Sequence, residues 1–135
     1  MKGNYILQIN LSEDKEIRVG KLGNIYFKKG FYAYIGSAMN SLEGRINRHL
    51  RFDKKFHWHI DYLLKHAEIS KVFYKQINER IECKVAETFN KKLESIKHFG
   101  CSDCSCKSHL FYGSQEEIEN TSNNLGFNIK NIQNP

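Results

Sequence analysis

Proline and long apolar runs are nearly absent from this sequence. The single proline is the last residue, Pro135, and no internal repeat or low-complexity linker interrupts the 135 residues. No apolar run approaches the roughly 18 residues that a membrane-spanning helix needs, and residues 1–10 lack the apolar centre and cleavage site of a secretory signal. We therefore expect one domain over residues 1–135, in a soluble, cytoplasmic protein with no membrane partner.

Acidic residues are also in the minority. The chain has 15 aspartates and glutamates against 21 lysines and arginines, which gives a formal net charge of +6 and an isoelectric point near 9.1. A positive surface potential attracts polyanions. The composition therefore favours nucleic acid as a partner.

Cysteines are few, and three of the four lie in the short segment CSDCSC. Disulfide frameworks usually space their cysteines along the chain, so in a reducing cytosol we expect metal binding or free thiols. Two hypotheses stay open for residues 101–109: a structural zinc site, within reach of His57 and His59, or reduced cysteines packed as small apolar groups. The candidate zinc ligands are Cys101, Cys104, Cys106 and His109.

Hydrophobic periodicity predicts an α/β fold, with a small central antiparallel sheet flanked by helices. Alternation predicts strands at residues 3–11, 16–19, 24–28, 31–37, 69–77 and 109–113, the first four of them in one sheet. A 3.6-residue repeat predicts helices at residues 41–51, 57–66, 79–96 and 114–126, the last closed by Gly126. Asn40 is the predicted N-cap of the first helix, and Glu43 is its capping-box carboxylate.

The predicted helix at residues 41–51 places two polar side chains beside its apolar stripe. Arg45 and His49 are four residues apart and border the stripe, whereas Arg48 and Arg51 point outward on a helical wheel. One interpretation is an arginine that extends over the edge of the core and a histidine with a satisfied hydrogen bond. The other is a pair of functional groups next to the sheet. The apolar stripe consists of Leu42, Ile46 and Leu50.

The predicted helix at residues 79–96 has a carboxylate within its apolar arc. Glu82 falls inside this arc, whereas Glu87 and Glu94 lie on the opposite side. A buried carboxylate costs several kcal/mol unless a cation, a metal or hydrogen-bond donors meet it. Glu82 is therefore either the partner of a buried salt bridge, for example to Arg45, or part of a functional site. The arc consists of Ile81, Val85, Phe89, Leu93 and Ile96.

Two tyrosine motifs complete this pattern. The segments GNY (residues 3–5) and YIG (residues 34–36), followed by Arg45 and Glu82, resemble the GIY-YIG nuclease family. The segments GFYAYIGSA, LEGRINRHLR, HWHIDYLL and FGCSDCSCKSHLFYG are similar to the Uri subfamily of small stand-alone domains. The resemblance extends from Gly3 to about Tyr112, and it depends on the order and combination of the motifs.

The resemblance implies a small α/β sandwich that hydrolyses phosphodiester bonds in nucleic acid, with DNA as the expected substrate. It makes Tyr5 and Tyr34 the paired tyrosines, with Tyr5 favoured as the group that activates water, and Arg45 the residue that stabilises charge on the phosphate. Glu82 would hold one divalent cation, Mg²⁺ or Mn²⁺. His49 would move a proton or bind the phosphate. The expected nucleic-acid-binding residues are Ser37, Arg45, Arg48, His49 and Arg51.

The sequence departs from the family pattern at three points. Asn4 stands where the family name has isoleucine, and the long interval between Tyr5 and Tyr34 predicts an additional hairpin. The late asparagine of many members has no clear counterpart, so Ser102 or Asp103 is the expected replacement. Two other functions stay open: a nucleic-acid-binding module without cleavage, and a zinc-stabilised cytosolic interaction domain. With no separate DNA-reading domain in 135 residues, we expect either a preference for nucleic-acid structure or ends, or targeting through a partner protein.

Overall fold

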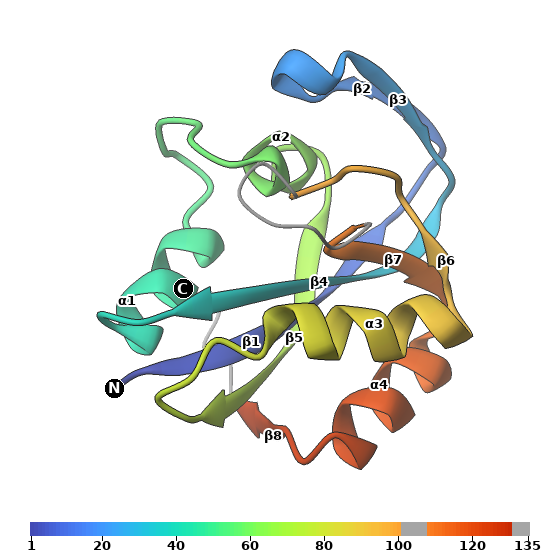
Figure 1. The fold of residues 1–135 in the computed structure, drawn as a ribbon. Coiled ribbons are helices and arrows are strands. Elements are labelled where there is room, and N and C mark those ends of the chain that lie inside the picture. Colours follow the sequence, from blue (N-terminus) through green and yellow to red (C-terminus); the bar gives the residue numbers. More distant parts are fainter. Residues whose placement is uncertain (101–107, 131–135) are drawn as a thin grey trace.

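A computed structural model describes residues 1–100 and 108–130 of the chain. The central sheet is antiparallel, and its six strands lie in the order β6-β7-β4-β1-β5-β8. Four helices surround it (Figure 1), so the predicted α/β class with a central antiparallel sheet is confirmed. The strands are β1 (Gly3–Leu11), β4 (Gly30–Ala38), β5 (Glu68–Gln76), β6 (Glu94–Ser95), β7 (Leu110–Gly113) and β8 (Asn128–Lys130).

The pair β1 and β4 forms the middle of the sheet. The two strands are in register over their whole length, from Gly3 opposite Ala38 to Leu11 opposite Gly30. Both are almost entirely buried, because helices cover the two faces of the sheet and leave little room for water. Side chains alternate between the faces, so neighbouring residues of β1 contact different helices.

Each face of the sheet has its own apolar core. On one face, Leu7 and Ile9 of β1 pack with residues of α1 (Leu42–Leu50) and α2 (His59–Leu64). On the other face, Ile6 packs with residues of α3 (Glu82–Lys92) and α4 (Gln115–Asn124). Figure 1 shows α3 and α4 lying together on one side of the sheet and α2 on the other.

The hairpin expected between the two tyrosine motifs is present. It consists of β2 (Lys15–Arg18) and β3 (Asn24–Phe27), joined through the short 3₁₀ helix η1 (Gly20–Leu22). The expectation that these strands join the central sheet is wrong, because they pair only with each other in a separate two-stranded sheet. Ile17, Val19 and Phe27 of the hairpin are buried in the core on the α1 and α2 face, and this packing holds it.

Several helix boundaries differ from the prediction. Ser41, and not Asn40, caps α1, since its hydroxyl accepts a hydrogen bond from Gly44 N at 3.0 Å. Glu43 makes no capping-box contact and instead lies 3.9 Å from the N-terminal amine. Helix α3 starts at Glu82 and ends at Lys92, which is shorter than the predicted 79–96. Residues 94 and 95 leave the helix because they pair with β7 as strand β6.

Helix α4 is the best-predicted helix. Ser114 and Glu117 exchange hydrogen bonds in a reciprocal capping box at its start. Gly126 follows its end with φ of 83°, a conformation that glycine adopts without strain, so the predicted closure is confirmed. Strand β8 follows it directly. It was not predicted, because three residues pairing with β5 leave no periodic signal.

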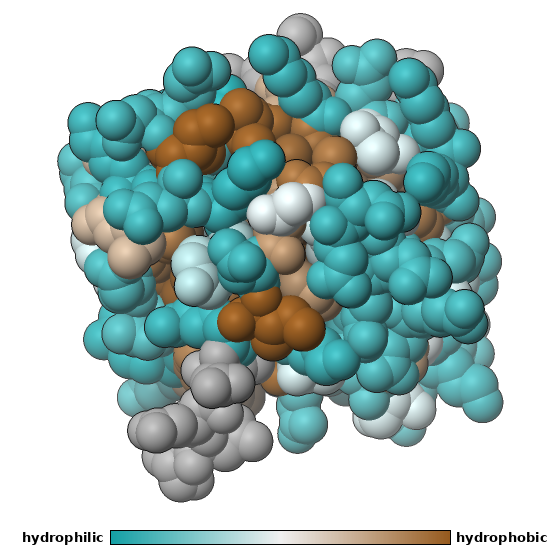
Figure 2. Space-filling model, turned by 90° about the horizontal axis from the view of Figure 1, so that it is seen from below, coloured by the Kyte–Doolittle hydropathy of each residue, from teal (hydrophilic) through white to brown (hydrophobic). Residues whose placement is uncertain are grey.

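The described surface is mostly polar. Figure 2 shows the molecule from below, with hydrophobic areas limited to patches between hydrophilic side chains. Ile129 of β8 is one exposed apolar residue, at 53%. None of the helices within residues 1–100 and 108–130 has the length and apolar character that crossing a bilayer requires.

Candidate active site

A cavity of ≈ 370 Å³ opens at the end of β4. Strand β7 pairs only with residues 31–34 of β4, so the last residues of β4 extend beyond it. Side chains from both faces of the sheet can therefore meet at this edge, together with the start of α3. The cavity is lined by Tyr5, Tyr34, Gly36, Ser37, Arg45, Trp58, Arg80, Glu82, Gly100 and His109.

The two motif tyrosines lie next to each other on the α1 face of the sheet. Their ring centroids are 6.5 Å apart, Tyr5 from β1 and Tyr34 from β4. Tyr5 is paired with Gly36 in the sheet register, and its ring covers this glycine so closely that a Cβ at residue 36 would collide with it. Glycine at position 36 is therefore needed to give the Tyr5 ring its place. Burial raises the pKa of Tyr5 and of Tyr34.

Tyr5 is hydrogen-bonded to His49 and also has the Arg45 guanidinium within hydrogen-bonding reach. Its hydroxyl lies 2.8 Å from Nε2 of His49, which comes from α1 and is 2% exposed. Burial lowers the pKa of His49 to about 3, so the ring is neutral at neutral pH. Nδ1 is buried without a hydrogen-bond partner in the described structure. We assign the proton to Nε2, because a buried lone pair without a donor is tolerated better than a buried N–H without an acceptor.

This arrangement corrects the role expected for His49. A histidine with a pKa near 3 is a poor proton carrier at neutral pH, and His49 does not line the cavity, so the structure does not support a phosphate contact. With the proton on Nε2, the ring donates to the Tyr5 oxygen. The Tyr5 hydroxyl proton can then point into the cavity, while the contact with His49 fixes the position of the Tyr5 oxygen.

Arg45 is held at the cavity by two contacts. One guanidinium nitrogen donates to the carbonyl of Ser37 at 3.0 Å, and the group lies 4.4 Å from the ring centre of Trp58. A guanidinium has five N–H donors, so it can keep the Ser37 bond and still donate to a phosphate oxygen. The Ser37 hydroxyl donates its hydrogen to Oδ1 of Asn4 at 2.5 Å, so this hydrogen is not free to bind a phosphate oxygen.

The expectation that Arg48 points into solvent is wrong. Its guanidinium forms two hydrogen bonds of 3.0 Å with Asp61, which is fully buried, and it lies 4.5 Å from the Trp58 ring centre. Asp61 also accepts from the backbone N–H groups of His57 and Trp58. Arg48 therefore stabilises the turn that presents Trp58, while Arg51 is exposed as expected.

Glu82 lines the cavity, but it is not the buried carboxylate that the helical wheel suggests. It lies in line with Val85 and Phe89 of the apolar stripe, yet it is the first residue of α3 and is only half-buried. Among residues 1–100 and 108–130 it forms no ion pair with Arg45. The predicted alternative of a buried salt bridge is therefore not what the structure contains.

Asn4 fixes the start of α3. This residue is fully buried on the α3 face of β1, and its amide donates to the carbonyl of Glu79 at 2.9 Å. Its Oδ1 accepts from the backbone N–H of Ile81 at 3.2 Å. The two bonds hold the chain directly before Glu82. Asn4, which stands where the GIY-YIG motif has isoleucine, therefore supports the backbone next to the Glu82 carboxylate through these hydrogen bonds.

The cavity offers one carboxylate to a cation. Within the described residues, no group of three or more histidine, cysteine, aspartate or glutamate side chains is placed to hold a metal ion. Glu82 alone suits a hard divalent ion such as Mg²⁺, which keeps several water ligands and uses one or two protein carboxylates. It does not suit zinc, which in structural sites takes four protein ligands.

The cysteine segment can be assessed only in part, because Cys101, Cys104 and Cys106 lie outside the described residues, as do Ser102 and Asp103. His109 is 4% exposed and lines the cavity, and burial lowers its pKa. His59 accepts a hydrogen bond from Gly100 N at 2.8 Å. Cys83, next to Glu82 in α3, is disulfide-bonded, a state that was not predicted from the sequence.

A family model matches residues 4–130 of the chain. The chain belongs to the family described as Domain of unknown function DUF123. No curated protein and no solved structure shows a significant match. Membership of DUF123 therefore assigns no activity, and the side chains in the cavity carry the functional argument.

Three residues of the DUF123 site were not predicted. Arg80 lines the cavity two residues before Glu82, Trp58 supports Arg45, and Asn4 supports the start of α3. A polar residue inside the apolar strand GNYILQINL was a signal for Asn4, since a buried amide needs partners. The only tryptophan of the chain, between two histidines, was a weaker signal.

Buried neutral His49 makes folding of this DUF123 domain sensitive to mild acid. In the unfolded chain histidine takes up a proton below about pH 6.5, whereas folded His49 does so only near 3. The unfolded state therefore binds more protons in this window, and the free energy of unfolding falls by up to about 1.4 kcal/mol per pH unit as pH is lowered. Urea unfolding between pH 7 and 4.5 measures the slope.

The variant His49→Gln isolates this effect. It removes the titrating group, and the slope between pH 6.5 and 4.5 should become shallower by a large part of that amount. Carboxylates whose pKa is lowered, such as Asp61, act mainly below this range. Equal slopes for the two proteins would contradict the buried neutral state of His49.

Proposed function

We propose that this domain is a divalent-metal-dependent endonuclease that hydrolyses phosphodiester bonds in nucleic acid, with a site of the GIY-YIG type and DNA as the substrate. One observation supports it most strongly. Tyr5 of β1, Tyr34 of β4, Arg45 of α1 and Glu82 of α3 come from four separate elements and line one cavity. The sequence resemblance assigns these same residues to catalysis.

The cavity has the electrostatics of a phosphate site. Arg45 and Arg80 both line it, and the N-terminus of α3 carries the positive end of the helix dipole. Glu82 is the only carboxylate among the described residues that line it. Arg45 is oriented in advance by Ser37 and Trp58, so it can stabilise the charge that develops on a phosphate without further rearrangement.

Tyr5 is the residue that would orient and activate water. The hydroxyl faces a ring nitrogen of His49 on one side, and its phenolate form is favoured by the charge of Arg45. In the proposed hydrolysis the Tyr5 phenolate takes a proton from the water that attacks phosphorus, the bond to the leaving oxygen breaks, and the leaving alkoxide takes up a proton from solvent. Because burial raises the pKa of Tyr5, the reactive phenolate is favoured at alkaline pH.

Glu82 would hold the divalent cation. When bound, such an ion supplies Lewis-acid stabilisation of the phosphate and lowers the pKa of nearby water and hydroxyl groups. Asn4 keeps the backbone before Glu82 in place through its bonds to residues 79 and 81. The protein thus contributes a carboxylate in a fixed position at the edge of the phosphate site.

Cleavage assays test the proposal directly. The protein is incubated with labelled single-stranded, duplex and branched DNA and with RNA, in Mg²⁺, in Mn²⁺ and in chelator. We expect cleavage that requires the divalent ion and stops on chelation. Binding of the panel without cleavage by any substrate in either metal would instead identify a nucleic-acid-binding module, and the absence of both would refute a nucleic-acid function.

A further inference from the structure

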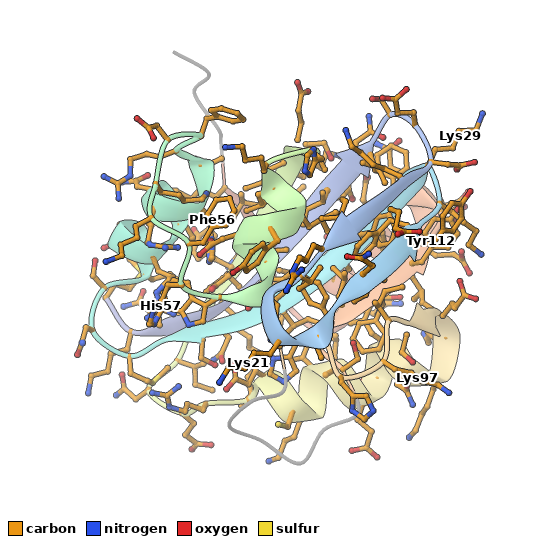
Figure 3. All side chains as sticks on the ribbon, turned by 90° about the horizontal axis from the view of Figure 1, so that it is seen from above. Lys21, Lys29, Phe56, His57, Lys97 and Tyr112 are labelled. Carbon is orange, nitrogen blue, oxygen red and sulfur yellow. The ribbon has the colours of Figure 1, made fainter. Side chains whose placement is uncertain are left out.

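The loop between α1 and α2 exposes two large aromatic rings. Phe52 is 70% exposed and Phe56 is 36% exposed, although burying a phenylalanine normally stabilises a fold by about 2 kcal/mol. Figure 3 shows Phe56 beside α2, with His57 next to it along the loop. Two exposed rings four residues apart form an apolar patch of the kind that can mark contact with another molecule.

A single lysine brings the two rings together. Nζ of Lys65, at the end of α2, lies 5.7 Å from the ring centre of Phe52 and 5.7 Å from that of Phe56. Tyr62, one turn earlier on α2, packs edge-on against Phe56 with the ring centres 4.8 Å apart. The aromatic platform, defined here as Phe52, Phe56 and Lys65, is therefore one surface supported by α2.

The loop that carries the platform is anchored at both ends. Lys54 donates to the last carbonyls of α1, at 2.8 Å to that of His49. At the other end, buried Asp61 accepts from the backbone N–H groups of His57 and Trp58. Hydrogen bonds therefore fix both ends of the loop that carries the rings. Because the loop is already ordered, little conformational entropy is lost when a ligand binds.

The charge around the platform matches a nucleic-acid strand. The exposed cations are Arg51, Lys55 and Lys65. Against them stand two exposed acidic residues, Asp53 of the loop and Glu68, which lines a hollow together with Phe52. Trp58 lies two residues after Phe56 and lines the catalytic cavity, so its backbone is within about 7 Å of that of Phe56. A strand that passes through the cavity can therefore continue onto the platform.

We propose that Phe52 and Phe56 stack unpaired bases, so that the substrate has a single-stranded segment next to the bond that is cut. This inference rests on the proposed nuclease function. Exposed aromatic rings with neighbouring cations are how proteins bind single strands without reading sequence, since every base has a face for stacking. In a duplex the bases are already stacked on each other and cannot reach the rings.

Binding without cleavage tests the inference. Fluorescence anisotropy with a labelled single-stranded oligonucleotide and with a blunt duplex is measured in chelator. We expect Phe52→Ala and Phe56→Ala each to weaken single-strand binding by about 10-fold or more, while duplex affinity changes little. Tyr26→Ala is the matched control, because Tyr26 is 61% exposed on the hairpin, away from the platform, and its loss should leave both affinities unchanged.

Two further variants separate stacking from other contacts. Phe52→Leu and Phe56→Leu keep apolar surface without an aromatic face, and they should bind single strands as weakly as the alanine variants. Lys65→Gln should reduce the slope of log affinity against log salt by about 0.7, the value for one phosphate contact on a single strand. The alanine variants should keep the slope of the unmodified protein.

The outcomes distinguish this inference from the function on which it rests. In one outcome, wild-type protein cleaves nucleic acid, while the Phe52→Ala and Phe56→Ala variants bind single strands as well as the wild-type protein does. This result would overturn the platform and leave the proposed nuclease function intact. Strong single-strand binding that depends on both rings, without cleavage in any metal, would support the platform and refute the nuclease. Full binding by the leucine variants would identify a general apolar contact, as for a protein partner, and would also overturn base stacking.

Discussion

Glu82→Gln is expected to lower metal-dependent cleavage by about three orders of magnitude or more. The change keeps the shape of the side chain and removes the charge that would hold the proposed cation at the start of α3. Glu82 is half-buried and pairs with no cation among the described residues, so the free energy of unfolding should change by less than about 0.5 kcal/mol. Single-turnover cleavage and urea unfolding measure the two quantities.

Glu87→Gln is the matched control for this change. Glu87 is exposed on the same helix, so the substitution removes an equal charge from α3 away from the cavity and should leave cleavage intact. Normal metal-dependent cleavage by folded Glu82→Gln protein would falsify the metal assignment. A loss of about 3 to 5 kcal/mol of stability, restored by adding Arg45→Met, would instead indicate a buried ion pair that the structure does not contain.

Tyr5→Phe is expected to lower cleavage by about two to four orders of magnitude. The phenylalanine ring can keep its place over Gly36, whereas the oxygen that faces His49 Nε2 is lost. Because the pKa of Tyr5 lies above its usual range, the wild-type rate should rise with pH through the alkaline range. The variant should lack this rise, and rates measured between pH 7 and 10 show the difference.

Tyr32→Phe controls for the loss of a buried tyrosine hydroxyl. Tyr32 is 1% exposed and donates to the carbonyl of Lys28 at 2.6 Å, away from the cavity, so this variant should lose stability but keep its rate and its pH profile. A Tyr34→Phe protein that loses the alkaline rise, while Tyr5→Phe retains it, would move the role of activating water to Tyr34.

The sequence was most informative where a signal was long or local. Strand β1 was predicted with its observed bounds, because nine consecutive residues alternate between the two faces. The closure of α4 at Gly126 was also predicted, because a glycine directly after a helix is a local signal. The motif order also selected Tyr5, Tyr34, Arg45 and Glu82, which the fold brings to one cavity.

The rest depended on contacts between distant parts of the chain. Residues 94 and 95 continue the helical pattern of α3, and only pairing with β7 converts them into a strand. Asn4 reaches Ile81 across 77 positions of sequence, so no local pattern could reveal its role. Arg48 appears outward on a helical wheel, and only the position of Asp61 on α2 explains its buried contacts.

Two adjacent residues of β1, Asn4 and Tyr5, contribute to the site from opposite faces of the sheet. Asn4 holds the start of α3, and Tyr5 lines the cavity and is the residue proposed to activate water. A one-residue insertion or deletion within this strand would exchange the two faces and disable both contributions at once. The hairpin between residues 12 and 29 pairs only with itself and lines none of the cavity. Within DUF123 we therefore expect differences in length to accumulate in the hairpin and to be excluded from β1.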